Sequence, residues 1–211
     1  MKELIIIGAR GFGREVYSLA KDCQEARNDY VIKGFLDDNS DALSGMAGYP
    51  PILDSVEHYI PTANDAFICA LGNPKWQKHY AELILQKGGE FISLVHPSVI
   101  LGKNTKIGKG CIIHRDAILS CDISLGNFVS CQALSVLGHD VVINDYCHLG
   151  SFSMVGGYSH IHSLTTLHPG SIILPHVTIE ENCTVGAGAV VIRTVKSGTT
   201  VYGNPAKVLT F

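Results

Sequence analysis

The chain has 211 residues, of which 46% are hydrophobic and 17% are charged, so it can bury a sizeable core. The formal net charge is −3 and no run of basic residues occurs, which argues against a nucleic-acid or acidic-membrane surface. The apolar run near the start, Leu4 to Ile7, is too short for a signal-peptide core or a membrane span. We therefore expect a soluble, cytoplasmic protein.

Residues 1–94 alternate between strand-like and helix-like segments. Leu4–Gly8 predicts a buried strand, followed by a glycine-rich turn and a helix. Val31–Leu36 and Ala66–Leu71 predict two more strands, and Lys75–Gln86 predicts a second helix that ends at Gly88–Gly89. This order is typical of a small, mostly parallel, Rossmann-like α/β sheet, and we take 1–94 as one domain.

Three segments at the predicted carboxyl ends of these strands point to a ligand. Gly8–Gly13 reads G-x-x-G-x-G between a strand and a helix, where glycines admit a ligand and a helix N-terminus favours phosphate. This is not the dinucleotide spacing, so NAD is not predicted. Asp37–Asp38 ends the next strand and Gly72 follows the third. Together they predict a nucleotide or nucleotide-sugar pocket, although a tight turn and a solvated acidic turn would explain each segment separately.

Residues 95–196 repeat with a period of six, without an insertion. Hexad position five is always small or β-branched, and glycine recurs at position two, where it is expected to serve the corner. Three short strands and three corners close a triangular coil of 18 residues, so the repeat predicts a parallel β-helix of five to six coils, capped by the C-terminal tail. Position one is apolar throughout and should fill the interior: Val95, Leu101, Ile107, Ile113, Leu119, Leu125, Cys131, Leu137, Ile143, Leu149, Val155, Ile161, Leu167, Ile173, Ile179, Val185 and Val191.

The seven cysteines do not predict a disulfide framework. Cys111, Cys147 and Cys183 occupy the same hexad position at spacings of two coils, which places them about 10 Å apart along the helix. We expect small, buried thiols in a reducing compartment.

The regular scaffold has no structural need for His139, Asp140 and His148. Acyl transfer from a thioester needs a base near neutral pKa, which a histidine supplies, and a neighbouring carboxylate orients or stabilises it. One coil on from His139 stands Gly157, which leaves space above the imidazole and a backbone N–H facing the same groove. The alternative for a lone histidine here is an exposed corner residue.

The α/β front, the hexads, the motif HD-x-x-I-x-D-x-x-H from 139 to 148 and the tail GNPAK together resemble one family along the whole chain. It is the sialic acid O-acetyltransferase and nucleotide-aminosugar N-acetyltransferase family of hexapeptide-repeat acyltransferases. The resemblance implies a left-handed β-helix over 95–211, acetyl-CoA as co-substrate, no metal, a nucleotide-sugar substrate for surface glycan biosynthesis and a homotrimer with sites between subunits.

The resemblance also assigns roles to residues. His139 is implied to be the general base, Asp140 to tune it, and His148 to meet the thioester region of acetyl-CoA. Further acetyl-CoA contacts are implied near Gly157, Pro169 and Ala187. The substrate-binding residues are implied to be Arg10, Gly11, Phe12, Asp37, Asp38 and Gly72.

Two departures and one geometric consequence accompany the resemblance. Phe12 stands where many members have a loop histidine, and His160, His162 and His168 are extra polar groups without an assigned role. His139 and His148 are half a coil apart, so within one chain they should face different sides. We therefore expect His148 to serve the His139 of a neighbouring subunit.

Acetyl transfer to the amino group of a nucleotide-linked aminosugar is thus the expected activity, with His139 as base. O-acetylation of sialic acid or another sugar hydroxyl remains open, as does a non-catalytic nucleotide-sugar-binding protein. A metal enzyme of the γ-class carbonic anhydrase type is disfavoured, because no two histidines are five residues apart.

Overall fold

The apolar run Leu4–Ile7 forms the centre of a four-stranded parallel sheet in the computed structural model, which describes residues 1–209. Strand β1 (Lys2–Ile7) pairs on one side with β2 (Tyr30–Leu36) and on the other with β4 (Asp65–Cys69). The short edge strand β3 (Ile52–Asp54) completes the order β3-β2-β1-β4 and was not predicted.

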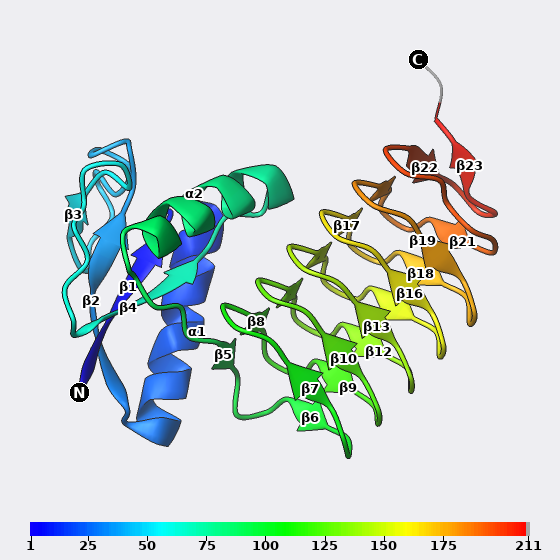
Figure 1. The fold of residues 1–211 in the computed structure, drawn as a ribbon, viewed down its shortest axis with the longest axis horizontal. Coiled ribbons are helices and arrows are strands. Elements are labelled where there is room, and N and C mark those ends of the chain that lie inside the picture. Colours follow the sequence, from blue (N-terminus) through cyan, green and yellow to red (C-terminus); the bar gives the residue numbers. More distant parts are fainter. Residues whose placement is uncertain (210–211) are drawn as a thin grey trace.

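Two helices cover opposite faces of this sheet (Figure 1), because its central strand alternates its side chains between them. Leu4 and Ile6 pack with helix α1 (Gly11–Arg27) in one buried cluster. Ile5 and Ile7 pack with helix α2 (Pro74–Gln86) in another. The predicted strand–helix order is confirmed, with boundaries shifted by one or two residues.

The hexad repeat forms a β-helix in which two-residue strands recur every six residues. Face 1 holds β5, β8, β11, β14, β17 and β20, face 2 holds β6, β9, β12, β15, β18 and β21, and face 3 holds β7, β10, β13, β16 and β19. Face 1 is extended by β22 and the antiparallel β23, which cap the end. The strands are β5 (Leu94–Val95), β6 (Ile100–Leu101), β7 (Lys106–Ile107), β8 (Ile112–Ile113), β9 (Ile118–Leu119), β10 (Ser124–Leu125), β11 (Ser130–Cys131), β12 (Val136–Leu137), β13 (Val142–Ile143), β14 (His148–Leu149), β15 (Met154–Val155), β16 (His160–Ile161), β17 (Thr166–Leu167), β18 (Ile172–Ile173), β19 (Thr178–Ile179), β20 (Thr184–Val185), β21 (Val190–Val191), β22 (Thr200–Tyr202) and β23 (Lys207–Val208).

The interior is filled as the repeat predicts from the second coil onward, whereas Val95 and Ile107 in the first coil are only partly buried. From Ile113 to Val191 every residue at hexad position one is buried. Leu101, in the first coil, keeps 48% of its surface exposed, because no earlier coil covers it. All seven cysteines are free thiols, as expected.

The corners differ from the prediction. The left-handed residues stand at hexad position four, and they include bulky ones such as Leu134, Phe152 and Tyr158. The glycines at position two have another cause: a Cβ on Gly102 would lie 2.5 Å from the backbone of Ser120 in the next coil. Close stacking of coils therefore selects glycine there, rather than turn conformation.

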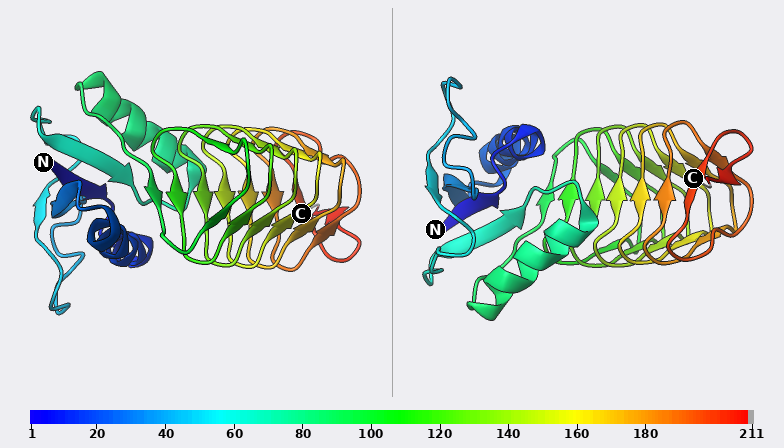
Figure 2. Two further views of the ribbon diagram at one scale, coloured as in Figure 1. Left: turned by 90° about the horizontal axis from the view of Figure 1, so that it is seen from below. Right: turned by 90° about the horizontal axis from the view of Figure 1, so that it is seen from above.

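The α/β part packs on the first coils of face 1 (Figure 2). Leu94 and Ile112 belong to the buried cluster under α1. Phe128 belongs to the one under α2, and the partly buried Tyr146 packs against it. Arg115 adds an ion pair of 2.8 Å to Asp22 on α1. This packing brings the carboxyl edge of the sheet close to the middle of face 1.

Candidate functional site

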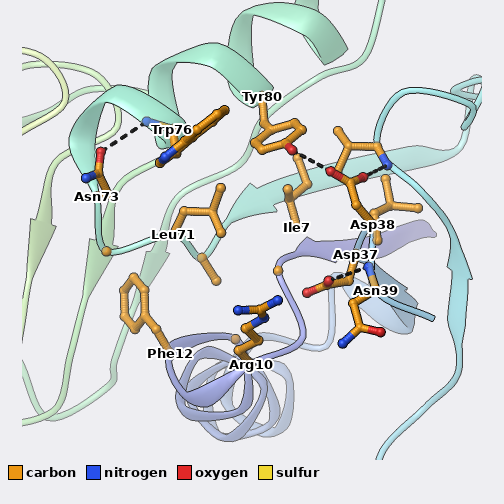
Figure 3. Close-up of a pocket in the computed structure, with 16 residues that line it drawn as sticks. Ile7, Arg10, Phe12, Asp37, Asp38, Asn39, Leu71, Asn73, Trp76 and Tyr80 are labelled. Carbon is orange, nitrogen blue, oxygen red and sulfur yellow. Dashed lines mark hydrogen bonds between the residues drawn. The ribbon is translucent and has the colours of Figure 1, made fainter. Parts of the chain in front are cut away.

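A cavity of about 640 Å³ opens at the carboxyl ends of β1, β2 and β4 (Figure 3). Open α/β sheets bind ligands at this edge. Of the residues predicted to bind substrate, all but Gly11 line the cavity: Arg10, Phe12, Asp37, Asp38 and Gly72. The three strand ends singled out in the sequence therefore meet at one cavity.

The acidic pair at the end of β2 holds the cavity wall in place. One oxygen of Asp37 accepts a hydrogen bond of 2.8 Å from the backbone N–H of Ala9, and the other accepts one of 2.9 Å from Asn39. Asp38 accepts from the backbone N–H of Val56 at 3.2 Å and from the hydroxyl of Tyr80. The carboxylate of Asp38 raises the pKa of Tyr80 to about 12, so that phenol remains a hydrogen-bond donor.

The turn between β1 and α1 requires two of its three glycines. Gly8 has φ +94°, and a Cβ on Gly13 would lie 1.9 Å from the carbonyl oxygen of Gly8, so both are required by the tight turn. A Cβ on Gly11 would meet nothing within 4 Å. Helix α1 has no side-chain cap at Arg10 and no acidic residue in its first turn, which leaves its first N–H groups to an anion.

Two aromatic residues on α2 form the opposite wall, and sequence reasoning missed them. Trp76 and Tyr80 stand one turn apart, with their rings stacked at a centroid distance of 6.1 Å. The helix is started by Asn73, whose side chain accepts from the N–H groups of Lys75 and Trp76. The signal in the sequence is an aromatic pair at i, i+4 directly after the third strand's Gly72–Asn73.

The pair His139–Asp140 lies at the corner between faces 2 and 3, after β12. Nδ1 of His139 is 2.9 Å from Oδ2 of Asp140, and both side chains are about half exposed. With the carboxylate as acceptor, Nδ1 carries the proton and Nε2 keeps its lone pair. This is the arrangement of a general base with an orienting acid.

The coil above His139 is shaped around its ring. A Cβ on Gly157 would lie 2.9 Å from both Cε1 and Nε2 of His139, so a larger residue there would displace the ring from this position. Tyr158 packs perpendicular to the imidazole at a centroid distance of 5.0 Å and stacks on His176. Among the backbone hydrogen bonds of the described residues, none uses the N–H of Gly157.

His148 lies elsewhere, on β14 of face 1. Its Nδ1 is 2.8 Å from the hydroxyl of Ser130 in the coil before, and its ring is perpendicular to Phe12 at a centroid distance of 5.7 Å. Burial lowers the pKa of His148 to about 4, so the imidazole is neutral at physiological pH. Ser130 was not predicted; it is the residue directly opposite His148 in the ladder.

The predicted acetyl-CoA contacts fall on two edges of face 2. Gly157 follows β15, at the same corner as His139. Pro169 and Ala187 follow β17 and β20, at the corner between faces 1 and 2. One chain therefore presents His139 with Gly157 on one edge, and Pro169 with Ala187 on the other, on the side of His148. His160, on β16, belongs to face 3 and stacks on His162 at 4.0 Å.

The comparisons with known proteins agree with this geometry. Residues 3–84 match the family described as the PglD N-terminal domain, and residues 158–193 match the bacterial transferase hexapeptide repeats. The GDP-perosamine N-acetyltransferase of Escherichia coli O157:H7 is 30% identical over 202 residues, which cover 94% of this chain and 81% of that protein. The chain belongs to the nucleotide-aminosugar N-acetyltransferase family of hexapeptide-repeat acyltransferases.

Other relatives of this N-acetyltransferase support the same assignment. The UDP-N-acetylbacillosamine N-acetyltransferase of Bacillus subtilis is 32% identical over 117 residues, covering 54% of this chain and 51% of that protein. WeeI from Acinetobacter baumannii has 27% identity and a TM-score of 0.87, with coverage of 99% and 100%. PerB from Caulobacter crescentus, solved with CoA and GDP-perosamine, has 21% identity and a TM-score of 0.90, covering 100% and 98%, and shows the same fold.

These findings confirm the expected fold class, with its left-handed β-helix, and the expected enzyme class, acetyltransferase. Within residues 1–209, no group of three or more His, Cys, Asp or Glu side chains is placed to hold a metal ion. No helix in that range is long and apolar enough to cross a membrane.

Proposed function

We propose that this N-acetyltransferase moves the acetyl group of acetyl-CoA to the amino group of a nucleoside-diphosphate-linked aminosugar. The relatives named for GDP-perosamine and UDP-N-acetylbacillosamine support this class of acceptor. The observation that carries the chemistry is the hydrogen-bonded pair of His139 and Asp140 beneath Gly157.

The cavity of the α/β part receives the nucleotide. The uncapped first turn of α1 offers N–H groups to the diphosphate, and Arg10 adds a positive charge beside them. Asp37 and Asp38 stand at the end of β2, where carboxylates meet ribose hydroxyls or a base edge. The sugar then extends past Phe12 toward face 1.

His139 removes the proton from the attacking nitrogen. The amine attacks the thioester carbonyl carbon, which forms the C–N bond and a tetrahedral intermediate, and its proton passes to Nε2 of His139. The C–S bond breaks as this intermediate collapses. The proton then returns from the imidazolium to the sulfur of CoA, so the base is regenerated. Asp140 holds Nδ1 and stabilises the imidazolium in between.

Two groups are available to the oxyanion of the tetrahedral intermediate. The backbone N–H of Gly157, in the coil next to His139, has no backbone partner among the described residues and is proposed as one donor. Neutral His148 can donate from Nε2 when the hydroxyl of Ser130 donates to its Nδ1.

The site is proposed to form between chains of a trimer, because one chain shows its two halves on opposite edges of face 2. The outward positions of face 2 are all apolar: Ile100, Ile118, Val136, Met154, Ile172 and Val190. The outward positions of face 3 are mixed, and include Lys106, Ser124 and His160. A second copy covering face 2 would bring the His139 edge of one chain to the His148 side of another.

Two further points belong to the proposal. We divide the chain into a nucleotide-sugar domain, residues 1–94, and an acetyl-CoA-binding domain with its cap, residues 95–211. We place the reaction in the cytoplasm, in keeping with seven free cysteines.

The test is release of free CoA from acetyl-CoA with a panel of acceptors: GDP-, UDP- and dTDP-aminosugars, free sialic acid and serine, with His139→Ala alongside. The proposal expects release with one nucleotide aminosugar and its loss in His139→Ala. Release with sialic acid alone would make the enzyme an O-acetyltransferase. Tight nucleotide-sugar binding without release across the panel would favour a non-catalytic binding protein.

A further inference from the structure

Phe12 belongs to two places at once. It lies in the first turn of α1 and lines the nucleotide cavity together with Arg10 and Leu71 (Figure 3). Its ring also reaches face 1 of the β-helix, where it stands perpendicular to His148, with an interplanar angle of 89° and a centroid distance of 5.7 Å. The centroid of the same ring lies 6.3 Å from that of His114, which directly follows β8, two coils earlier along face 1.

The imidazole of His148 is held from two sides by these contacts. The hydroxyl of Ser130 lies 2.8 Å from Nδ1, so Nε2 is the nitrogen that the proposed function assigns to acetyl-CoA. Phe12 bounds the ring from the α/β part. A perpendicular ring pair of this kind stabilises one orientation over others by roughly two- to tenfold in population.

The same enclosure limits the contact of His148 with water. Burial is the main cause that lowers the pKa of His148 to about 4, and the nearby His168 lowers it further. His114 also has its pKa lowered to about 4 by burial, with Arg115, His96 and His148 adding to it. No acidic side chain contributes to either shift, so the two imidazoles are neutral because they are covered.

We propose that Phe12 is a positioning residue for His148: the loop that receives the nucleotide sugar also fixes the imidazole at the acetyl-CoA end of the site. This inference rests on the proposed function, which makes His148 a contact of the thioester. Phe12 thereby links the two substrates' binding sites within one chain, while the base comes from the neighbour.

The proposal separates Phe12 from the other aromatic residues of the cavity. Trp76 lines the opposite wall, on α2, and its ring contacts are with His79 and Tyr80. Removal of either side chain should weaken nucleotide binding. Only removal of the Phe12 side chain should also change the position and titration of His148, so Trp76→Ala is the matched control.

The test uses the full-length protein and two measurements that need no turnover. The first follows the ring signal of His148 by NMR during a pH titration, with ¹³C-labelled histidine and His148→Gln for assignment. The second is the affinity for CoA alone by calorimetry. In Phe12→Ala we expect the His148 titration to move up toward the ordinary value, and CoA binding to weaken by about two- to tenfold. Phe12→Tyr should behave as wild type, and Phe12→Leu should lie between.

An unchanged His148 titration and unchanged CoA affinity in a folded Phe12→Ala protein would overturn the inference and reduce Phe12 to a cavity wall. The same result in Trp76→Ala as in Phe12→Ala would also overturn it, since the effect would then be general loosening. If Phe12→Ala is unfolded by circular dichroism, the comparison of Phe12→Leu with Phe12→Tyr decides in the same way. Failure of the proposed function would show itself differently. Wild-type protein would then release no CoA with any acceptor, while the His148 titration and the CoA affinity could still be measured.

Discussion

Nδ1 of His139 lies 2.9 Å from the carboxylate of its sequence neighbour Asp140, and Asp140 adopts a left-handed conformation with φ 57°. Hexad position four imposes this conformation at nearly every corner, so the repeat itself turns the acid back onto the base. The pair proposed to carry the catalysis thus needs no special loop.

Asp140→Asn should therefore lower kcat by roughly 10- to 100-fold, because the amide keeps the corner conformation but does not stabilise the imidazolium. The KM for acetyl-CoA should change little, since Asp140 acts through His139. Steady-state kinetics on the best acceptor measure both. An unchanged kcat would show that Asp140 has no part in the base.

Gly157→Ala should reduce kcat by at least about tenfold, because the new methyl group would stand 2.9 Å from Cε1 and Nε2 of His139 and displace the ring. The control is the double variant with His139→Ala. If Gly157 acts by leaving room for His139, adding Gly157→Ala to the His139→Ala protein should lower kcat no further. Equal additional losses in both backgrounds would contradict this explanation.

The two buried imidazoles should make the protein less stable in acid. The folded-state pKa of His114 is about 4, below its ordinary 6.5, so the unfolded chain takes up the proton first. The contribution of neutral His114 to the free energy of unfolding is complete above pH 6.5 and is lost as pH falls toward 4. At pH 5 the loss is about 2 kcal/mol for this group. Urea unfolding at pH 7.5 and pH 5.0 measures the difference, and His114→Gln should reduce it by about that amount. A wild-type protein equally stable at both pH values would contradict the assignment.

Met154→Lys should dissociate the assembly, because it places a charge in the apolar outer surface of face 2, where Met154 is 40% exposed in the single chain. Ser124→Lys is the matched control, at the same hexad position on face 3. Sedimentation or light scattering gives the mass of each. If Ser124→Lys dissociates the assembly and Met154→Lys does not, the interface lies on face 3 and the proposed interface on face 2 is contradicted.

The hexad pattern predicted the β-helix almost residue by residue, because interior positions such as Leu137 and Ile143 must be apolar in every coil. It did not predict the left-handed corners, since the repeat enforces that conformation on residues as different as Leu134, Asp140 and Tyr158. Their N–H groups are satisfied by the coil before, as in the bond of 3.1 Å from Tyr158 to the carbonyl of His139. That compensation is visible only once the coils are stacked.

Within the candidate site, contacts between sequence neighbours could be predicted, and contacts between different elements could not. His139 and Asp140 are adjacent in the sequence, so their pairing could be predicted from it. Ser130 meets His148 only through the ladder between β11 and β14. Phe12 meets it only because the α/β part packs on face 1, which no local pattern encodes.

The most direct test of the shared site mixes two inactive proteins. His139→Ala and His148→Ala chains, dissociated and reassembled together, should form mixed trimers in which some sites draw His139 and His148 from intact neighbours. We predict that CoA release with the acceptor reappears at up to about a quarter to a third of the wild-type rate, as expected for random mixing of two chains in a C₃ assembly. Mixed trimers, verified by mass, that never regain activity would contradict a site built by two chains.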